Sequence, residues 1–233
     1  MTPPAVTANG ATYYVSTAGS NANSGTLAAP WRTPGYGSRQ LSPGDTLVIL
    51  GGTYTLSVYD DDIVTPPAGV ATNWIVIRGQ DGNRPILRAG NNLLTAVELS
   101  NARYVKIANL EITNNGGQPF RDGIEALGGP ARDILLQDLD IHHLDEFGIN
   151  IGDAQNVQIW NSKIRYCGFG AVGGPEGTQG GWQNVLIAGC ELSYSGHYYQ
   201  GGAGPSPYDR PDGFGIDGDA LGLARAAIPH ENV

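Results

Sequence analysis

The chain has 233 residues, a formal net charge of −9 at pH 7 and 35 glycines, and only 15% of its residues are charged. Its 40% hydrophobic content suffices for a core, which excludes a disordered chain. The apolar runs are far shorter than the roughly 18 residues of a membrane span, and a basic footprint is missing, so we expect neither a membrane span nor a nucleic-acid partner.

The two cysteines, Cys167 and Cys190, say little about the protein's compartment. They are too few for a disulfide framework and lack the spacing of a metal site. The first residues carry neither the basic nor the apolar segment of a signal peptide. From these features alone, either the protein is cytosolic or a signal peptide has been removed.

A short repeat begins at Leu47 and recurs at an interval typical of solenoids. Each copy has an apolar residue, any residue, a second apolar residue, any residue, and then Asn, Asp or Gly. Such short alternation predicts a β-strand that ends at a polar corner. The copies begin at Leu47, Ile75, Val105, Ile134, Val157 and Val185.

Two further series of short strands fall between these copies, and helical periodicity is absent almost everywhere. One series places an apolar residue three positions after the corner, at Ile112, Ile141, Ile164 and Leu192. The other begins at Val97, Ile124, Ile149 and Phe214, with a weak member at Ala171.

Several short strands per repeat predict a coil of parallel strands whose turns stack about 4.8 Å apart. A propeller would need about 40 residues per blade, and a leucine-rich repeat would need leucine spacing that is absent. We therefore predict an all-β right-handed parallel β-helix of about six turns over residues 46–219. Residues 1–45 would form an N-terminal extension and cap, and residues 220–233 a tail or incomplete turn.

The gapless alignment also predicts which residues stack. It places Leu47 opposite Ile75 and Ile49 opposite Ile77. Asn109, Asp138 and Asn161 fall at one corner, where a short polar side chain tolerates left-handed backbone. Two inward columns are expected: Val105, Ile134, Val157 and Val185 in one, and Ile107, Leu136, Ile159 and Ile187 in the other.

Several motifs are shared with a known group. They are Tyr13-Tyr-Val-Ser-Thr-Ala-Gly-Ser-Asn-Ala-Asn-Ser-Gly25, Pro30-Trp-Arg-Thr33, Ser42-Pro-Gly-Asp-Thr46, Gly52-Thr-Tyr54, Gly196-His-Tyr-Tyr199 and Tyr208-Asp-Arg-Pro-Asp-Gly-Phe-Gly-Ile216. With them the chain resembles secreted bacterial right-handed β-helix proteins, including the family 9 pectate lyases. Relatives usually place an amphipathic capping helix after the Trp-Arg-Thr motif. Only Pro34 to Leu41 is available here, so we expect that helix to be short or missing.

The resemblance implies a calcium site. In the family 9 lyases, aspartates hold a calcium ion and a later lysine removes the proton next to the sugar carboxylate. The Asp-Gly-Phe segment with the first ligand corresponds to Asp212 here, whereas Lys106 and Lys163 both precede it. The resemblance therefore carries over one ligand and no base, and we expect the chain to be an incomplete member. The alternative is that Asp212 only caps a turn.

Further polar residues are predicted on the same face. Glu98, Glu125 and Asn150 occupy equivalent outward positions, and Asp217 follows in the last turn. Stacked carboxylates are costly unless water, arginine or a cation screens them, and calcium prefers oxygen ligands. The hypothesis is a substrate face with calcium at Asp212 and Asp217. The alternative is a solvated acidic surface.

A long insertion carries aromatic residues that suit stacking on sugar rings. The candidates for substrate binding are His197, Tyr198, Tyr199, Tyr208 and Arg210. Their alternative role is packing against the flank of the coil. His142 and His143 are expected to point to opposite sides, as surface or corner histidines that cannot chelate one metal ion.

Three functional hypotheses follow. The chain is a polysaccharide lyase-like protein, a non-catalytic glycan-binding or structural scaffold, or an incomplete coil without its own activity. Paired-carboxylate glycoside hydrolysis has no marked residue pair here. An open C-terminal end predicts an end-to-end homodimer, with residues 220–233 as a plug in the alternative. The resemblance implies an extracellular or periplasmic location.

Overall fold

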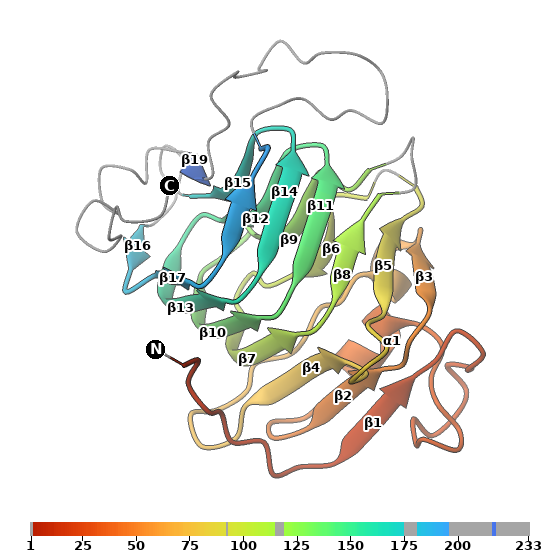
Figure 1. Ribbon diagram of the computed structural model, residues 1–233. Coiled ribbons are helices and arrows are strands. Elements are labelled where there is room, and N and C mark those ends of the chain that lie inside the picture. The colour runs from red at the N-terminus through yellow and green to blue at the C-terminus, as the bar shows by residue number, and fades with distance from the viewer. Residues whose placement is uncertain (1, 92, 115–118, 175–180, 196–215, 218–233) are drawn as a thin grey trace.

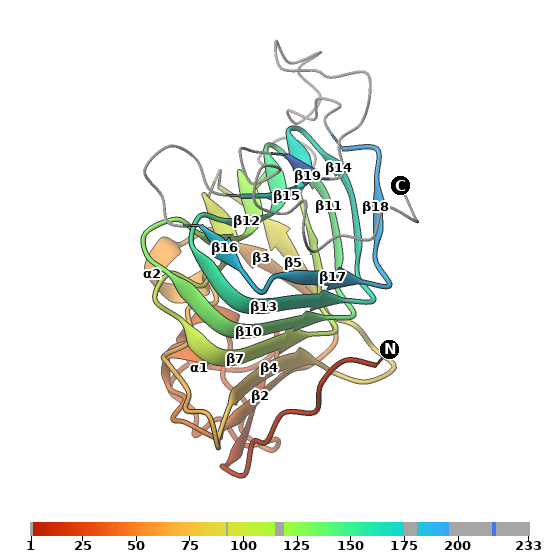
Figure 2. The same cartoon turned by 90° about the vertical axis from the view of Figure 1, so that its left-hand side faces the viewer.

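The computed structural model describes residues 2–91, 93–114, 119–174, 181–195 and 216–217. These residues form a coil of stacked turns, which Figures 1 and 2 show from two sides. Each regular turn passes through three sheets, and neighbouring strands within the described sheets pair in parallel. The predicted all-β parallel coil is confirmed.

The first sheet has eight strands and forms one side of the coil. Its register keeps residues one turn apart opposite each other; Ile134, for example, pairs with Val105 and Val157. Its strands are β1 (Thr12–Val15), β2 (Thr46–Ile49), β4 (Ile75–Gly79), β7 (Arg103–Ala108), β10 (Ala131–Gln137), β13 (Ala154–Trp160), β16 (Trp182–Gln183) and β17 (Leu186–Ala188).

The second and third sheets close the coil, with six and five strands. The second sheet comprises β3 (Thr53–Leu56), β5 (Ile86–Ala89), β8 (Glu111–Thr113), β11 (Asp140–Leu144), β14 (Lys163–Cys167) and β18 (Glu191–Ser193). The third sheet comprises β6 (Thr95–Glu98), β9 (Asp122–Ala126), β12 (Phe147–Ile151), β15 (Gly170–Gly173) and β19 (Ile216–Asp217). Each turn therefore runs from the third sheet to the first and then to the second.

The core consists of apolar columns that run along the coil. In the first sheet, Ile107, Leu136, Ile159 and Ile187 stack as predicted. Ile159 is 1% exposed. Val185 also packs against the core, but it lies between β16 and β17 rather than within a strand.

The first regular turn differs from the predicted alignment. Leu47 pairs with Ile77, and Ile49 pairs with Gly79, so the register is shifted by two residues. A shift of two keeps every side chain on the same side of the sheet. Apolar alternation could not distinguish the two registers, and the expectation that Leu47 lies opposite Ile75 was wrong.

Left-handed residues form the corner between the first and second sheets. The φ angles are 54° at Asn109, 54° at Asp138, 49° at Asn161 and 63° at Gly189. Short polar side chains and glycine tolerate this conformation, which costs other residues about 1–2 kcal/mol. The predicted corner at Asn109, Asp138 and Asn161 is confirmed, and it explains why the last four copies of the repeat end in Asn, Asp or Gly.

Two short helices lie in the N-terminal part, α1 (Pro34–Arg39) and α2 (Tyr59–Asp62). The expected short capping helix is thus present as α1, which contacts β1 and β2. A Cβ atom at Gly37 would lie only 2.8 Å from the Val15 side chain and 3.2 Å from that of Leu47. Glycine therefore allows α1 to lie directly on the first apolar side chains of the coil. No helix within the described residues is long and apolar enough to cross a membrane.

Candidate functional site

A column of equivalent positions crosses the third sheet. Glu98 pairs with Glu125, Glu125 with Asn150, Asn150 with Gly173, and Gly173 with Asp217. Alternation directs Glu98, Glu125 and Asn150 away from the core, because the residue before each of them, Val97, Ile124 or Ile149, belongs to the core. The shared position of the three predicted residues is therefore observed, while their role in binding stays a prediction.

The column is less open to solvent than its outward direction implies. Glu125 is 4% exposed and Asn150 is 8% exposed. A buried carboxylate needs charged or hydrogen-bonding partners. The alternative of a fully solvated acidic face is therefore wrong for Glu125.

Arg121 supplies the positive charge that pairs with the buried acidic side chains in this part of the column. Its Nη2 donates to Glu125 Oε2 at 2.6 Å, and its Nε donates to Asp122 Oδ2 at 3.2 Å. Glu146 Oε2 lies 3.8 Å from the same Nε. The Arg121 guanidinium thus contacts three acidic side chains. Two of them come from β9, and Glu146 comes from the turn after β11.

Asp122 organises the turn beneath Arg121. Its side chain is fully buried, and it accepts hydrogen bonds from the Phe147 backbone N–H at 3.0 Å and from Asn150 Nδ2 at 3.1 Å. Burial raises the pKa of Asp122, and Arg121 and these two donors oppose that rise. Asp122 therefore fixes Asn150 and the start of β12 against the preceding turn.

Glu98 and Glu125 form a carboxyl pair. Burial raises the pKa of Glu125 to about 8, Arg121 opposes the rise, and Asp122 and Glu98 add to it. Glu98 Oε1 also accepts the Ser100 backbone N–H at 2.6 Å. Glu125 therefore takes up a proton more readily than an exposed glutamate does.

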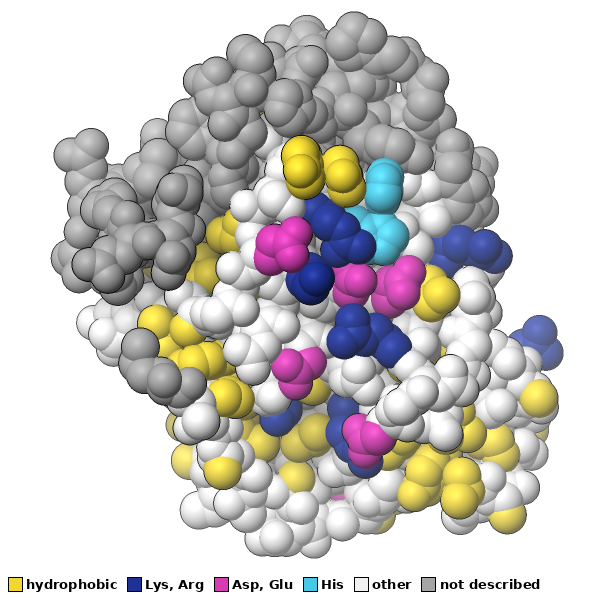
Figure 3. All heavy atoms as spheres, in the orientation of Figure 1, with side chains coloured by type: hydrophobic (Ala, Val, Ile, Leu, Met, Phe, Trp, Pro, Cys, Tyr) yellow, Lys and Arg dark blue, Asp and Glu magenta, His cyan; other side chains and the backbone are white. Residues whose placement is uncertain are grey.

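The second sheet carries the two histidines, and the structure corrects the prediction made for them. His142 Nδ1 lies 2.7 Å from His143 Nδ1, so the side chains do not point to opposite sides. His143 has a φ of 59°, and this left-handed residue breaks the alternation of the strand. The His143 ring stacks on Tyr166, which stacks on the 60% exposed Tyr194. Figure 3 shows the histidines in cyan on this face.

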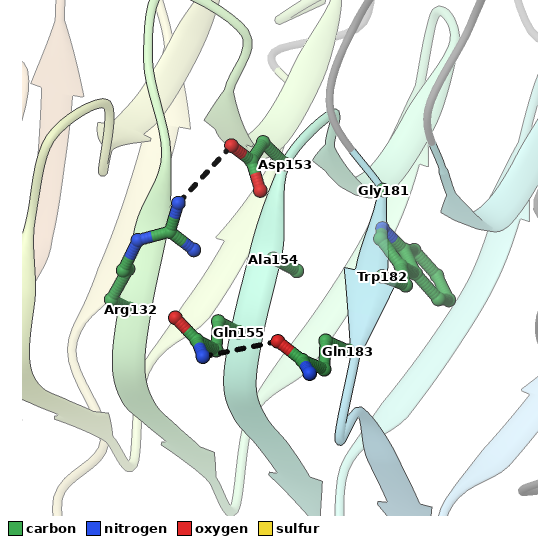
Figure 4. Close-up of a pocket in the computed structure, with 7 residues that line it drawn as sticks. All are labelled: Arg132, Asp153, Ala154, Gln155, Gly181, Trp182 and Gln183. Carbon is green, nitrogen blue, oxygen red and sulfur yellow. Dashed lines mark hydrogen bonds and ion pairs between the residues drawn. The ribbon is translucent and has the colours of Figure 1, made fainter.

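A shallow cavity of about 300 Å³ lies where β10, β13 and β16 begin. Figure 4 shows its polar lining: Arg132 Nη2 lies 3.3 Å from Asp153 Oδ2, and Gln155 Nε2 donates to Gln183 Oε1 at 3.1 Å. Trp182 also lines it. The volume is at the lower end for ligand pockets. The cavity belongs to the first sheet and is separate from the column of Glu98.

Comparison with known families decides what kind of coil this is. Residues 13–167, more than half of the chain, match the model described as the Pel9A-like right-handed β-helix region. The chain belongs to the Pel9A-like β-helix family. This confirms the predicted right-handed fold and the resemblance to family 9 pectate lyases. No curated protein sequence matches the chain.

Solved structures share this family's fold at low sequence identity. Pectate lyase Pel9A is 17% identical with a TM-score of 0.63, over 79% of this chain and 48% of its own. A rhamnogalacturonan lyase is 18% identical with a TM-score of 0.58, over 78% and 51%. The GH136 lacto-N-biosidase from Eubacterium ramulus is 20% identical with a TM-score of 0.59, over 77% and 41%. The chain thus spans about half or less of each, and the likeness shows the fold alone.

Several predicted site residues of this Pel9A-like chain lie outside the described residues. Asp217 is described as part of β19 through its pairing with Gly173. The others are His197, Tyr198, Tyr199, Tyr208, Arg210 and Asp212.

The sequence prediction missed Arg121, Asp122 and Glu146. The available signal was the segment Arg121-Asp-Gly123, which places a charge pair and a glycine directly before a predicted strand.

The described residues of the Pel9A-like coil do not by themselves form a calcium cage. Among them, no three His, Cys, Asp or Glu side chains converge as a metal site. Arg121 already neutralises the carboxylates around Glu125. Oxygen ligands at Asp212 and Asp217 would suit calcium chemically, and that assignment stays a prediction.

Proposed function

We propose that the outward face of the third sheet binds a uronate-containing polysaccharide. The column of Glu98, Glu125, Asn150 and Asp217 on a Pel9A-like coil supports this proposal. Stacked turns repeat hydrogen-bonding groups about 4.8 Å apart along one line, which suits a linear polymer better than a compact ligand.

A cation would be needed to hold an acidic polymer on this face. The chain carries a net charge of −9, and like charges repel at short range. We propose that calcium bridges uronate carboxylates to Asp212 and Asp217 at the C-terminal end of the column. Six to eight oxygen ligands suit this ion, so protein, sugar and water oxygens would share it.

Binding rather than cleavage is the activity that we propose for this chain alone. A lyase needs a base beside the carbon next to the uronate carboxylate. The two lysines of the chain are Lys106 in β7 of the first sheet and Lys163 in β14 of the second. Neither belongs to the third sheet, so the lysine base of the family 9 lyases has no counterpart among the described residues of the column.

The proposed location is extracellular or periplasmic. A polysaccharide of this kind is too large to cross a membrane unaided, so a protein that binds it works on the same side. The proposed end-to-end homodimer remains a prediction, because residues 220–233 lie outside the described residues. Sedimentation at micromolar concentration distinguishes it from a monomer.

Calorimetric titration with oligogalacturonate, with and without calcium, tests the proposed function. We expect calcium-dependent binding that Glu98→Gln weakens by about 10-fold, as expected for one charge-assisted hydrogen bond. Gln155→Ala, on the first sheet, is the matched control and should bind normally. Absorbance of an unsaturated product is followed in the same samples. A rise would show cleavage, and no binding in either condition would refute the proposal.

A further inference from the structure

The second sheet presents a histidine pair on its outer surface, away from the proposed polysaccharide face. Thr113 in β8 and His142 in β11 lie at equivalent positions, each two residues after the paired Glu111 and Asp140. The left-handed φ of 59° at His143 turns the His143 side chain to the same surface of the sheet as the His142 side chain. Figure 3 shows these histidines at the sheet surface among charged side chains.

The two imidazole rings approach each other through their Nδ1 atoms. His142 Nδ1 and His143 Nδ1 are 2.7 Å apart, and the ring planes are nearly perpendicular at 83°. Thr113 Oγ1 lies 3.1 Å from the same His142 Nδ1. One of the two nitrogens carries the proton of this contact, and the other presents a lone pair.

Glu111 indicates which tautomer His142 adopts. His142 Nε2 lies 3.4 Å from Glu111 Oε1, and a carboxylate favours the tautomer with its proton on Nε2. The lone pair of His142 is then on Nδ1, facing His143. A carboxylate behind one imidazole nitrogen, with the other nitrogen turned toward the ion, is the usual support of a metal-bound histidine.

The surroundings hold the pair in place. His143 stacks on Tyr166 at 4.9 Å between ring centroids, and its backbone carbonyl accepts Asn114 Nδ2 at 2.7 Å. Arg165, the nearby cation, is ion-paired with Asp140. Burial, His142 and Arg165 lower the pKa of His143.

We propose that His142 and His143 bind a divalent transition-metal ion of the zinc class through their Nδ1 atoms. Two nitrogens on one tetrahedral zinc ion are about 3.3 Å apart, given Zn–N distances of about 2.0–2.1 Å. The observed Nδ1–Nδ1 distance of 2.7 Å needs only a small widening by side-chain rotation. The His143 proton moves from Nδ1 to Nε2, so no net proton is released, and water completes the coordination.

Calorimetric titration of the tag-free, chelator-treated full chain with zinc chloride tests this site. We expect one zinc ion per chain with a dissociation constant of about 1–100 µM, because half the protein ligands of a structural zinc site are present. His142→Gln and His143→Asn should each weaken binding at least about 10-fold, and asparagine still tolerates the left-handed backbone. Glu111→Gln should weaken it by about 10-fold.

His230→Gln is the matched control and should leave zinc binding unchanged. In the unmodified protein, long-range ¹H–¹⁵N spectra should show shifts at the Nδ1 atoms of two histidines when zinc is added, which needs no variant to fold. The proposal is overturned by the absence of zinc binding at millimolar concentration, by unchanged binding in both histidine variants, or by spectra in which neither Nδ1 responds. In that case the pair is only a hydrogen bond within the sheet.

Discussion

Glu98 and Glu125 lie directly opposite each other on neighbouring parallel strands, and Glu98 contributes to the raised pKa of Glu125. Stacking of the turns brings two acidic side chains next to each other whenever both equivalent positions are acidic. Arg121 on one side and the Ser100 backbone N–H on the other supply partners for the two groups. The fold thus places a proton-binding pair at the centre of the proposed ligand face.

The stability of the protein should decrease between about pH 4.5 and pH 8 because of Glu125. Its pKa in the folded protein is raised to about 8, so the folded state holds a proton that the unfolded state has released over that range. The loss should be roughly 1–4 kcal/mol. Glu125→Gln should flatten this dependence. Urea unfolding at several pH values measures it, and an equally steep decline in the variant would contradict the assignment.

Removal of Arg121 should destabilise the protein more than removal of another surface cation. Arg121→Ala leaves Asp122 and Glu125 buried without their charge partner, at a cost of about 2–4 kcal/mol. This expected loss of stability is smaller than for a fully buried ion pair, because the Arg121 side chain is 31% exposed. Lys163→Ala, at a 62% exposed side chain, is the control and should change stability by about 0.5 kcal/mol or less. Equal effects of the two would contradict the role of Arg121.

The core column predicts a large effect at Ile159. This side chain is 1% exposed and lies between Leu136 and Ile187, so Ile159→Ala leaves a cavity. We expect a loss of about 2–5 kcal/mol in chemical unfolding. Gln158→Ala, at the neighbouring outward position, should cost much less. A small loss at Ile159 would mean that the column collapses to fill the space.

The left-handed corner at Asn161 predicts that replacement by alanine is costly and replacement by glycine is not. With a φ of 49°, Asn161→Ala should cost about 1 kcal/mol or more, whereas Asn161→Gly should be close to neutral. Gly189 already occupies the same corner one turn later. Thermal unfolding of the two variants checks this. Equal stability of both would show that the left-handed backbone is not what selects the residue.

The periodic features were predictable from the sequence, and the local exceptions were not. Alternation fixes which side of a strand faces the core, so Ile107, Ile112 and Ile124 could be assigned without coordinates. The two-residue shift at Leu47 preserves alternation and leaves no trace in the pattern. Residue type alone does not fix the left-handed backbone at His143, so the convergence of the histidines was not foreseen.

The candidate site was predictable in position but not in environment. Equivalent strand positions placed Glu98, Glu125 and Asn150 in one column. The burial of Glu125 depends on Arg121, which reaches it from the turn before β9 and has no periodic signature. A turn of irregular length is set by its own contacts, and repeat analysis cannot supply them.

The constant register of the first sheet makes its turns interchangeable building units. Ala131 pairs with Ala154, so the segment 131–153 forms one complete turn. Arg103 pairs with Arg132, so the preceding turn is longer. A gene that duplicated or deleted one such unit would still encode strands that stack in register. Coils of this kind can therefore change length by whole turns during evolution, and engineered copies of the segment 131–153 offer a direct way to lengthen this one.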